Sequence, residues 1–397
     1  MKTWSSSNST VGYCQLLALS ALLSLGLALP VSASVTPKVA GGFLHTVALR
    51  SDGTVVAWGM NAAGQLGDGS TTKRLTPTPV PGLTGVSAIA AGSDHTVVLK
   101  NDGTVAAWGN NRHGQLGDGS ATDRHIPTPV PGLTGVTAIA VGTDNSMALK
   151  SDGTVLVWGE IDHGHLGIGS TSDRYSPTPV PGLTEVTAIA CSGNHSLALK
   201  KDGTVATWGD NSWGGLGDGT SIPRLLPTPV PGLTGVTAIA AGQQLGVALK
   251  SDGTVVTWGD NEYGQLGNGS TTKRLSPAPV AGLSGVTAIA ASYYHTVALK
   301  SDGTLVTWGC NAHGQLGDGG NKNLRTPTPV PGLSGVSYIN AGFGHTVAVK
   351  SDGMVASWGF NNYGQLGYGG TVERHTPNVV RQLNLLASNG VTAHPVN

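Results

Sequence analysis

The sequence predicts an all-β fold, a seven-bladed β-propeller of four-stranded blades built from 50-residue repeats. A Trp-Gly pair recurs without a slip at Trp58, Trp108, Trp158, Trp208, Trp258, Trp308 and Trp358. An Asp-Gly pair keeps the same register from Asp52-Gly53 to Asp352-Gly353. A fixed period is the signature of a repeat architecture, and the absence of any 3.6-residue period excludes a helical solenoid.

Each repeat predicts four short strands, which in the second repeat cover residues 86–91, 96–100, 104–108 and 127–130. The second and third strands join through Asp102-Gly103, a strong hairpin signal. The first strand is rich in small residues, which suits the crowded centre of a propeller. Proline cannot donate to a β-ladder, so the fourth strand, with Pro127 and Pro129, is expected at the outer edge of the blade.

Both chain ends differ from the repeats. An apolar run over 16–29 and the small residues up to Ala33 predict a cleaved signal peptide (1–33), although a retained anchor is an alternative. The propeller is expected over 34–383 and a C-terminal tail over 384–397. We therefore expect a secreted, periplasmic or cell-envelope protein with no membrane span after cleavage. Residues 35–40 are expected to supply the inner strand of blade one, in competition with the tail.

Composition limits the possible partners. The 22 basic and 22 acidic residues balance, which argues against nucleic acid as a partner because no excess of positive charge is available to neutralise phosphates. The three cysteines share no metal-ligand spacing, and a disulfide between Cys191 and Cys310 is not expected. A monomer without cofactor or metal is predicted.

The repeated polar residues are better explained by structure than by chemistry. A catalytic or metal-binding histidine would be one special copy, whereas five equivalent copies recur at His45, His95, His195, His295 and His345. We therefore expect these side chains to form structural hydrogen bonds. Asp68 and its counterparts suggest a calcium loop, but Ile168, Asn268 and Tyr368 occupy the same position in other repeats. These patterns predict that the protein is not an enzyme.

The repeat also carries a family likeness. The stretch His95–Lys100, followed by Asp102-Gly103, Trp108-Gly109 and Gly114–Gly117, resembles the regulator of chromosome condensation repeat over about residues 35–383. The resemblance implies a seven-bladed propeller. Members of that family include a nuclear exchange factor for the GTPase Ran and secreted bacterial propellers, one of which uses its loops to inhibit β-lactamases. The exchange activity depends on a protruding β-wedge, for which a strict 50-residue period leaves no room.

Topology predicts where function would lie. In an up-and-down blade, the strand one-to-two and strand three-to-four loops share one face, and the repeats diverge there. Blades two and three present polar residues such as Asp94, Asp144 and Glu160 on this face. Aromatic residues on rigidly held loops are common binding determinants. The candidate partner-binding residues are Phe43, Trp213, Tyr263, Tyr293, Tyr294, His313, Phe343, Phe360 and Tyr363.

The expected function is therefore that of an exported, non-catalytic binding propeller. Its partner is expected to be a protein held by the loop face that carries the aromatic residues. A carbohydrate-binding propeller at the cell envelope is the main alternative, because exposed Trp and Tyr rings also stack on sugars. A guanine-nucleotide exchange factor-like protein is a further alternative by family analogy.

Overall fold

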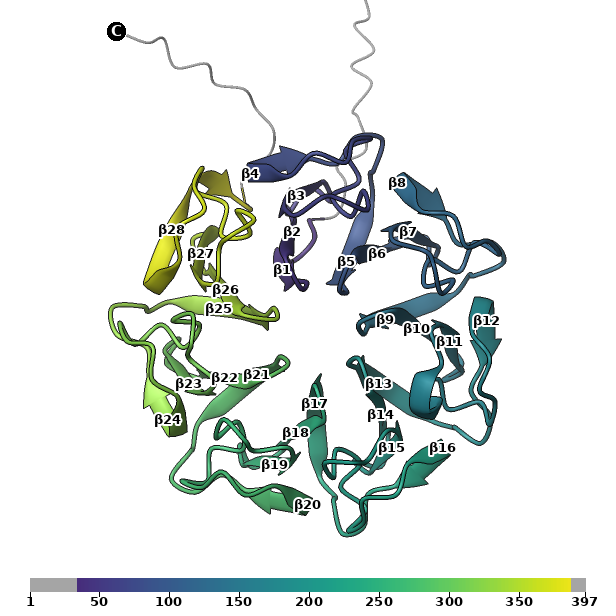
Figure 1. The fold of residues 1–397 in the computed structure, drawn as a ribbon, viewed down its shortest axis with the longest axis vertical. Helices are drawn as coiled ribbons and strands as arrows, with labels where there is room; N and C mark the ends of the chain where they lie inside the picture. The colour runs from purple at the N-terminus through teal and green to yellow at the C-terminus, as the bar shows by residue number, and fades with distance from the viewer. Residues whose placement is uncertain (1–33, 387–397) are drawn as a thin grey trace, which may run out of the picture. The chain divides into compact units, whose positions relative to one another are not determined.

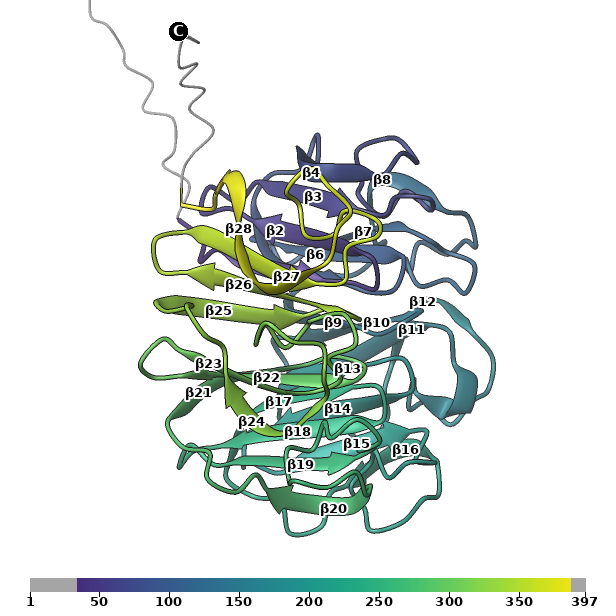
Figure 2. The same cartoon turned by 60° about the vertical axis from the view of Figure 1, so that its left-hand side comes forward.

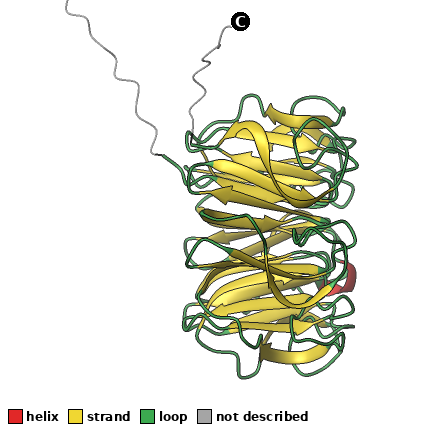
Figure 3. Cartoon of the chain, turned by 90° about the vertical axis from the view of Figure 1, so that its left-hand side faces the viewer, coloured by secondary structure: helices red, strands yellow, loops and turns green. Residues whose placement is uncertain are grey.

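The computed structural model describes residues 34–386, and within them it contains seven four-stranded antiparallel sheets arranged in a ring (Figure 1). The expected signal peptide (1–33) lies outside the described residues, as do residues 387–397. One short 3-10 helix, η1 (Asp162–Gly164), is present in this part of the chain (Figure 3). The predicted seven-bladed propeller is confirmed.

Within each blade the strands follow chain order from the axis outward (Figure 1). The inner strands are β1 (Lys38–Gly41), β5 (Val86–Ala91), β9 (Val136–Val141), β13 (Val186–Cys191), β17 (Val236–Gly242), β21 (Val286–Ala291) and β25 (Val336–Ala341). The second strands are β2 (His45–Leu49), β6 (His95–Lys100), β10 (Asn145–Lys150), β14 (His195–Lys200), β18 (Leu245–Lys250), β22 (His295–Lys300) and β26 (His345–Lys350).

The third strands carry the repeated tryptophan and are β3 (Val55–Gly59), β7 (Val105–Gly109), β11 (Val155–Gly159), β15 (Val205–Gly209), β19 (Val255–Gly259), β23 (Leu305–Gly309) and β27 (Met354–Gly359). The outer strands are β4 (Arg74–Pro79), β8 (Arg124–Pro129), β12 (Arg174–Pro179), β16 (Arg224–Pro229), β20 (Arg274–Pro279), β24 (Leu324–Pro329) and β28 (Arg374–Asn384). The predicted order of strands is confirmed, but the outer strand β8 begins three residues earlier than the prolines indicate.

The hairpin between the second and third strands is built by a side chain as well as by glycine. In blade two, Asp102 accepts hydrogen bonds from the backbone N of Thr104 (2.9 Å) and from its hydroxyl (2.6 Å). Only the glycine of the pair has a positive φ, 76° at Gly103. The Asp side chain therefore mimics a backbone turn, and the glycine supplies the left-handed residue that a three-residue hairpin loop requires.

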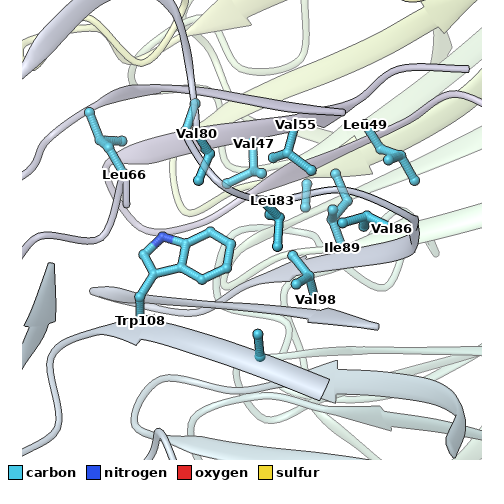
Figure 4. Packing of buried hydrophobic residues seen from close by; sticks show 13 residues of the cluster. Val47, Leu49, Val55, Leu66, Val80, Leu83, Val86, Ile89, Val98 and Trp108 are labelled. Carbon is cyan, nitrogen blue, oxygen red and sulfur yellow. The ribbon is translucent and has the colours of Figure 1, made fainter. Parts of the chain in front are cut away.

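The core consists of the interfaces between neighbouring blades (Figure 4). Trp108 of β7 is fully buried against Leu66, Val80 and Leu83 of the preceding blade. Its Nε1 donates a hydrogen bond of 2.9 Å to the carbonyl oxygen of Gln65. Every repeated tryptophan makes the same bond to the blade before it, so the predicted core role is confirmed.

Two glycines of each repeat are required by close contacts, one against this tryptophan and one directly after it in the chain. Gly67 has φ 71°, and a Cβ there would lie 2.6 Å from Nε1 of Trp108. Gly109 follows the tryptophan with φ 110°, and a Cβ there would lie 2.3 Å from the carbonyl oxygen of Asp94. The Gly-Gln-Leu-Gly stretch is therefore a packing surface for the indole ring of the next blade, because any larger residue would clash.

The ring closes by packing and hydrogen bonds, without exchange of strands between the first and last blades. The inner strand of blade one is β1, which pairs with β2. The prediction that this segment and not the tail supplies the strand is confirmed, but the strand covers Lys38–Gly41 rather than residues 35–40. The backbone of Ser51 joins both ends: its N donates to the carbonyl of Leu385 (2.8 Å), and its carbonyl accepts from Val35 N (2.9 Å). The outer strand β28 ends at Asn384, and the next residue, Leu385, is fully buried. The propeller therefore continues beyond residue 383 (Figure 2).

Candidate functional site

The loops that were expected to share one face do meet there. Gln65, in the loop between β3 and β4, donates a hydrogen bond of 2.7 Å to Asp94, in the loop between β5 and β6. Gln115 and Asp144 repeat this contact in the next pair of blades at 2.8 Å. We call this side of the propeller the loop face. Each loop is held by its own blade and by the following blade, so the face is a firmly supported surface.

A buried asparagine holds the long loop between the third and fourth strands in six of the seven blades, and Ile161 takes its place in blade three. In blade one the side-chain oxygen of Asn61 accepts from Leu66 N (2.9 Å), and its Nδ2 donates to the carbonyls of Ser70 and Thr72. This residue was not among the predicted site residues, although it recurs at the same position of the repeat as Asn111, Asn211, Asn261, Asn311 and Asn361. Its recurrence just after Trp-Gly is the signal that could have identified it.

The aspartate that suggested a calcium loop is part of the same scaffold. Asp68 forms an ion pair of 2.6 Å with Arg74 and accepts a hydrogen bond of 2.8 Å from the Ser70 hydroxyl. Burial raises the pKa of Asp68, but the Ser70 and Arg74 bonds outweigh it, so the pKa lies below its usual value. Among the side chains that the structure describes, no group of three or more His, Cys, Asp or Glu is arranged to hold a metal ion.

The histidines of the second strands form structural hydrogen bonds, as predicted, and four of the five bond to the next blade: His45, His95, His295 and His345. His45 Nε2 lies 3.1 Å from the hydroxyl of Thr96, which donates to the carbonyl of Gln65 (2.8 Å). Since the hydroxyl proton is used in that second bond, Nε2 of His45 must be the protonated nitrogen. Burial, with smaller effects from neighbouring histidines, lowers the pKa of His45 to about 3, so the ring is neutral at physiological pH.

Five of the candidate binding residues form one continuous group of rings on the loop face, which we call the aromatic cluster: Phe43, Tyr263, Tyr293, Tyr294 and Phe343. Phe43 stacks on Phe343 with a centroid distance of 3.9 Å, and Tyr293 meets Phe343 edge-on at 5.0 Å. Tyr294 lies 6.0 Å from Tyr293 and 5.1 Å from Tyr263. The expectation that Tyr293, Tyr294 and Phe343 form one patch is therefore confirmed.

The remaining candidates lie outside this cluster. Trp213 is 48% exposed, and the ammonium of Lys273 from the next blade lies 5.4 Å from the centre of its ring. His313 packs on Phe360 at 4.6 Å and also contacts Glu373 at 2.7 Å. Tyr363 is exposed. The structure thus divides the nine candidates into one cluster of five rings, one pair and two separate rings.

Tyr293 differs from the other rings because it reaches across the propeller axis. Its hydroxyl is hydrogen-bonded to the hydroxyl of Thr143 in the β9–β10 loop, and blades three and six lie on opposite sides of the ring (Figure 1). Burial raises the pKa of Tyr293 to about 12. This contact joins residues 150 positions apart. No sequence pattern predicts this contact, because it depends on the radius of the ring of blades.

The loops of blades two and three give the loop face a negatively charged half. Burial raises the pKa of Asp94, and the charge of Asp144 raises it further. Burial likewise raises the pKa values of Asp144 and Glu160. Nδ1 of His113 lies 2.9 Å from a carboxylate oxygen of Asp173. The loop face therefore combines an aromatic cluster with a neighbouring acidic region.

These features define a β-propeller whose loop face differs from blade to blade, which is the arrangement of a binding scaffold. A model of the RCC1-like domain matches residues 179–394, and regulator of chromosome condensation (RCC1) repeat models match 52–99, 102–149 and 152–199. A second repeat model matches 38–65, 86–115 and 136–164. The chain belongs to the regulator of chromosome condensation repeat family.

Solved structures agree with this assignment. Prp20p from Saccharomyces cerevisiae is 25% identical, with a TM-score of 0.75 over 85% of this chain and 86% of that chain. Its structure was described together with its binding to Gsp1p and histones. Human WBSCR16 is 27% identical, with a TM-score of 0.71 over 80% of this chain and 88% of that chain. No helix among residues 34–386 is long and apolar enough to cross a membrane.

Proposed function

We propose that this protein is an exported, non-catalytic binding propeller that holds a protein partner on its loop face. The observation that carries the proposal is the aromatic cluster. Its five half-buried rings come from loops of divergent sequence in blades five, six, seven and one. Large, well-supported aromatic side chains are the residues that most often dominate protein interfaces. The binding of Gsp1p and histones by Prp20p, a family relative, supports a binding role.

The geometry of the rings favours a protein over a sugar. Most ring contacts of the aromatic cluster are edge-on, with interplanar angles of 72° for Tyr293 and Phe343 and 65° for Tyr293 and Tyr294, and the pair Phe43 and Phe343 is stacked. Such packing gives an uneven, partly buried apolar surface rather than an open flat ring on which a sugar stacks. Trp213 is the most exposed candidate ring, but Lys273 lies over it. A knobbed apolar surface beside acidic loops suits a folded protein partner.

Capture followed by quantitative binding tests this proposal. The mature protein would be immobilised and exposed to culture medium and envelope extracts, and each captured protein would then be purified and its affinity measured. Tyr263→Ala with Tyr294→Ala is the informative variant, because these two rings belong to the aromatic cluster but do not cross the axis. Truncating interface anchors costs about 2 kcal/mol or more, so we expect a loss of affinity of about 30-fold.

The control changes the opposite face, where the Asp-Gly hairpins lie. Lys250→Ala, Lys300→Ala and Lys350→Ala together should leave the affinity within about twofold. If the lysine variant loses binding and the tyrosine variant keeps it, the binding surface lies on the face with the Asp-Gly hairpins and not on the loop face. Saturable binding on a glycan array that the tyrosine variant abolishes, with no protein partner captured, would replace the protein partner by a carbohydrate.

A further inference from the structure

The inner strands of all seven blades surround a cavity on the propeller axis. Its volume is about 420 Å³, and its wall runs from the inner strands up to the β1–β2, β5–β6 and equivalent loops. Small-molecule sites in proteins typically have volumes of about 300–1,000 Å³ and mainly apolar walls. The cavity therefore has the size of a binding site for a small molecule, and it lies beneath the aromatic cluster rather than within it.

Aliphatic side chains recur around the wall of the cavity. An Ile-Ala pair lies on five of the seven inner strands, represented by Ile89 and Ala90 of β5, whereas β25 has Asn340 after its isoleucine. Uncharged polar side chains such as Thr143 also line the cavity. None of the described residues that line it is Asp, Glu, Lys, Arg or His. An ion would therefore lose its hydration without gaining an opposite charge, which is strongly unfavourable.

The loop-face end of the cavity is covered by aromatic side chains. Tyr293 crosses this end and bonds to Thr143, while Phe43 and Phe343, at equivalent positions in blades one and seven, stack beside it.

We propose that this axial cavity binds a small, uncharged molecule with an apolar body. The Ile and Ala side chains of the inner strands would contact that body. Tyr293 and the stacked pair Phe43 and Phe343 would cover it on the loop face. The site shares these three rings with the surface proposed for the protein partner, but its test needs no partner.

The test uses two fluorescent probes that share a ring system. N-phenylnaphthylamine is uncharged and carries one N–H donor, whereas anilinonaphthalene sulfonate adds a negative charge to the same rings. We expect the uncharged probe to bind the full mature protein saturably with one site per chain. The sulfonated probe should bind at least about tenfold more weakly, because the wall offers no positive charge.

A channel-filling variant locates the binding. Ala140→Leu with Ala290→Leu places two larger side chains on β9 and β21, which face each other across the axis, and should weaken the uncharged probe at least about tenfold. The matched control, Ser176→Leu with Thr326→Leu, adds leucine at exposed positions on the outer strands of the same two blades and should leave affinity unchanged. If the double variant does not fold, Ala140→Leu alone replaces it, with partial weakening as the expected result.

Each other outcome would overturn the proposal. Absence of saturable binding of the uncharged probe to the wild-type protein would do so directly. Equal affinity for both probes would contradict the uncharged wall as the determinant. Unchanged affinity in the folded channel-filling variant would place the probe on the outside of the propeller, and the control variant would then be expected to show the loss.

Discussion

Replacing Trp208 by alanine tests the idea that the repeated tryptophan holds each blade to the one before it. The ring is fully buried among Leu149, Val180 and Val186. Its Nε1 donates 3.0 Å to the carbonyl of His165, but the Ser196 hydroxyl donates to the same oxygen at 2.9 Å. The carbonyl therefore keeps a partner, and the cost comes from the cavity, about 3–5 kcal/mol for a buried tryptophan.

This loss converts into a measurable shift in melting temperature. With an unfolding entropy of about 2.1 cal/mol/K per residue over about 350 residues, 3–5 kcal/mol lowers Tm by about 4–7 °C. Differential scanning calorimetry would measure the shift. Trp213→Ala is the matched control, because the same side chain in the same blade is 48% exposed there and should cost within about 0.5 kcal/mol. Equal shifts for both variants would refute the assignment of Trp208 to the blade interface.

Three further predictions address acid stability, ring closure and export. Burial lowers the pKa of His95 to about 4, from about 6.5 in the unfolded state. Between these two pH values the unfolded state binds more protons than the folded state, so stability falls as the pH drops through this window. In urea unfolding at several pH values, His95→Asn should reduce the slope of the unfolding free energy against pH by about 1.4 kcal/mol per pH unit. An unchanged slope would mean that His95 does not contribute to it. Between the last and first blades, Asn340 Oδ1 accepts a hydrogen bond of 2.8 Å from Gly41 N. Asn340→Ala should therefore cost about 1–3 kcal/mol of stability. An unchanged Tm would show that ring closure does not depend on this bond. The exported protein should begin just after Ala33, which its intact mass would show; a mass that retains the apolar run would mean an anchor.

Much of the candidate site could be predicted from the repeat. The 50-residue period and the alternation of loops between two faces place Tyr293, Tyr294 and Phe343 on adjacent loops, and the structure joins their rings. The contact of Tyr293 with Thr143 could not be predicted in this way. The period sets which blade a residue belongs to, but a contact across the axis also requires the radius of the ring.

The buried polar residues show the same division. Five equivalent histidines indicated a structural role, because identical copies imply identical surroundings. Their hydrogen-bond partners lie in the next blade, as Thr96 does for His45. Blade five breaks the pattern with Leu245 and Gly246, and Nε2 of His195 in blade four is left without a partner. Only the arrangement of neighbouring blades reveals that the change at Gly246 in blade five affects the hydrogen bonding of His195 in blade four.

The sequence by itself determined the number of blades, the order of strands within each blade and the burial of the tryptophans. These properties are local, because side-chain alternation, turn residues and proline act within one repeat of 50 residues. The tertiary structure decided how Ser51 joins the two ends of the chain, and it decided the width of the axial cavity. Both depend on the angle between blades added up over seven interfaces, and no single repeat encodes that sum.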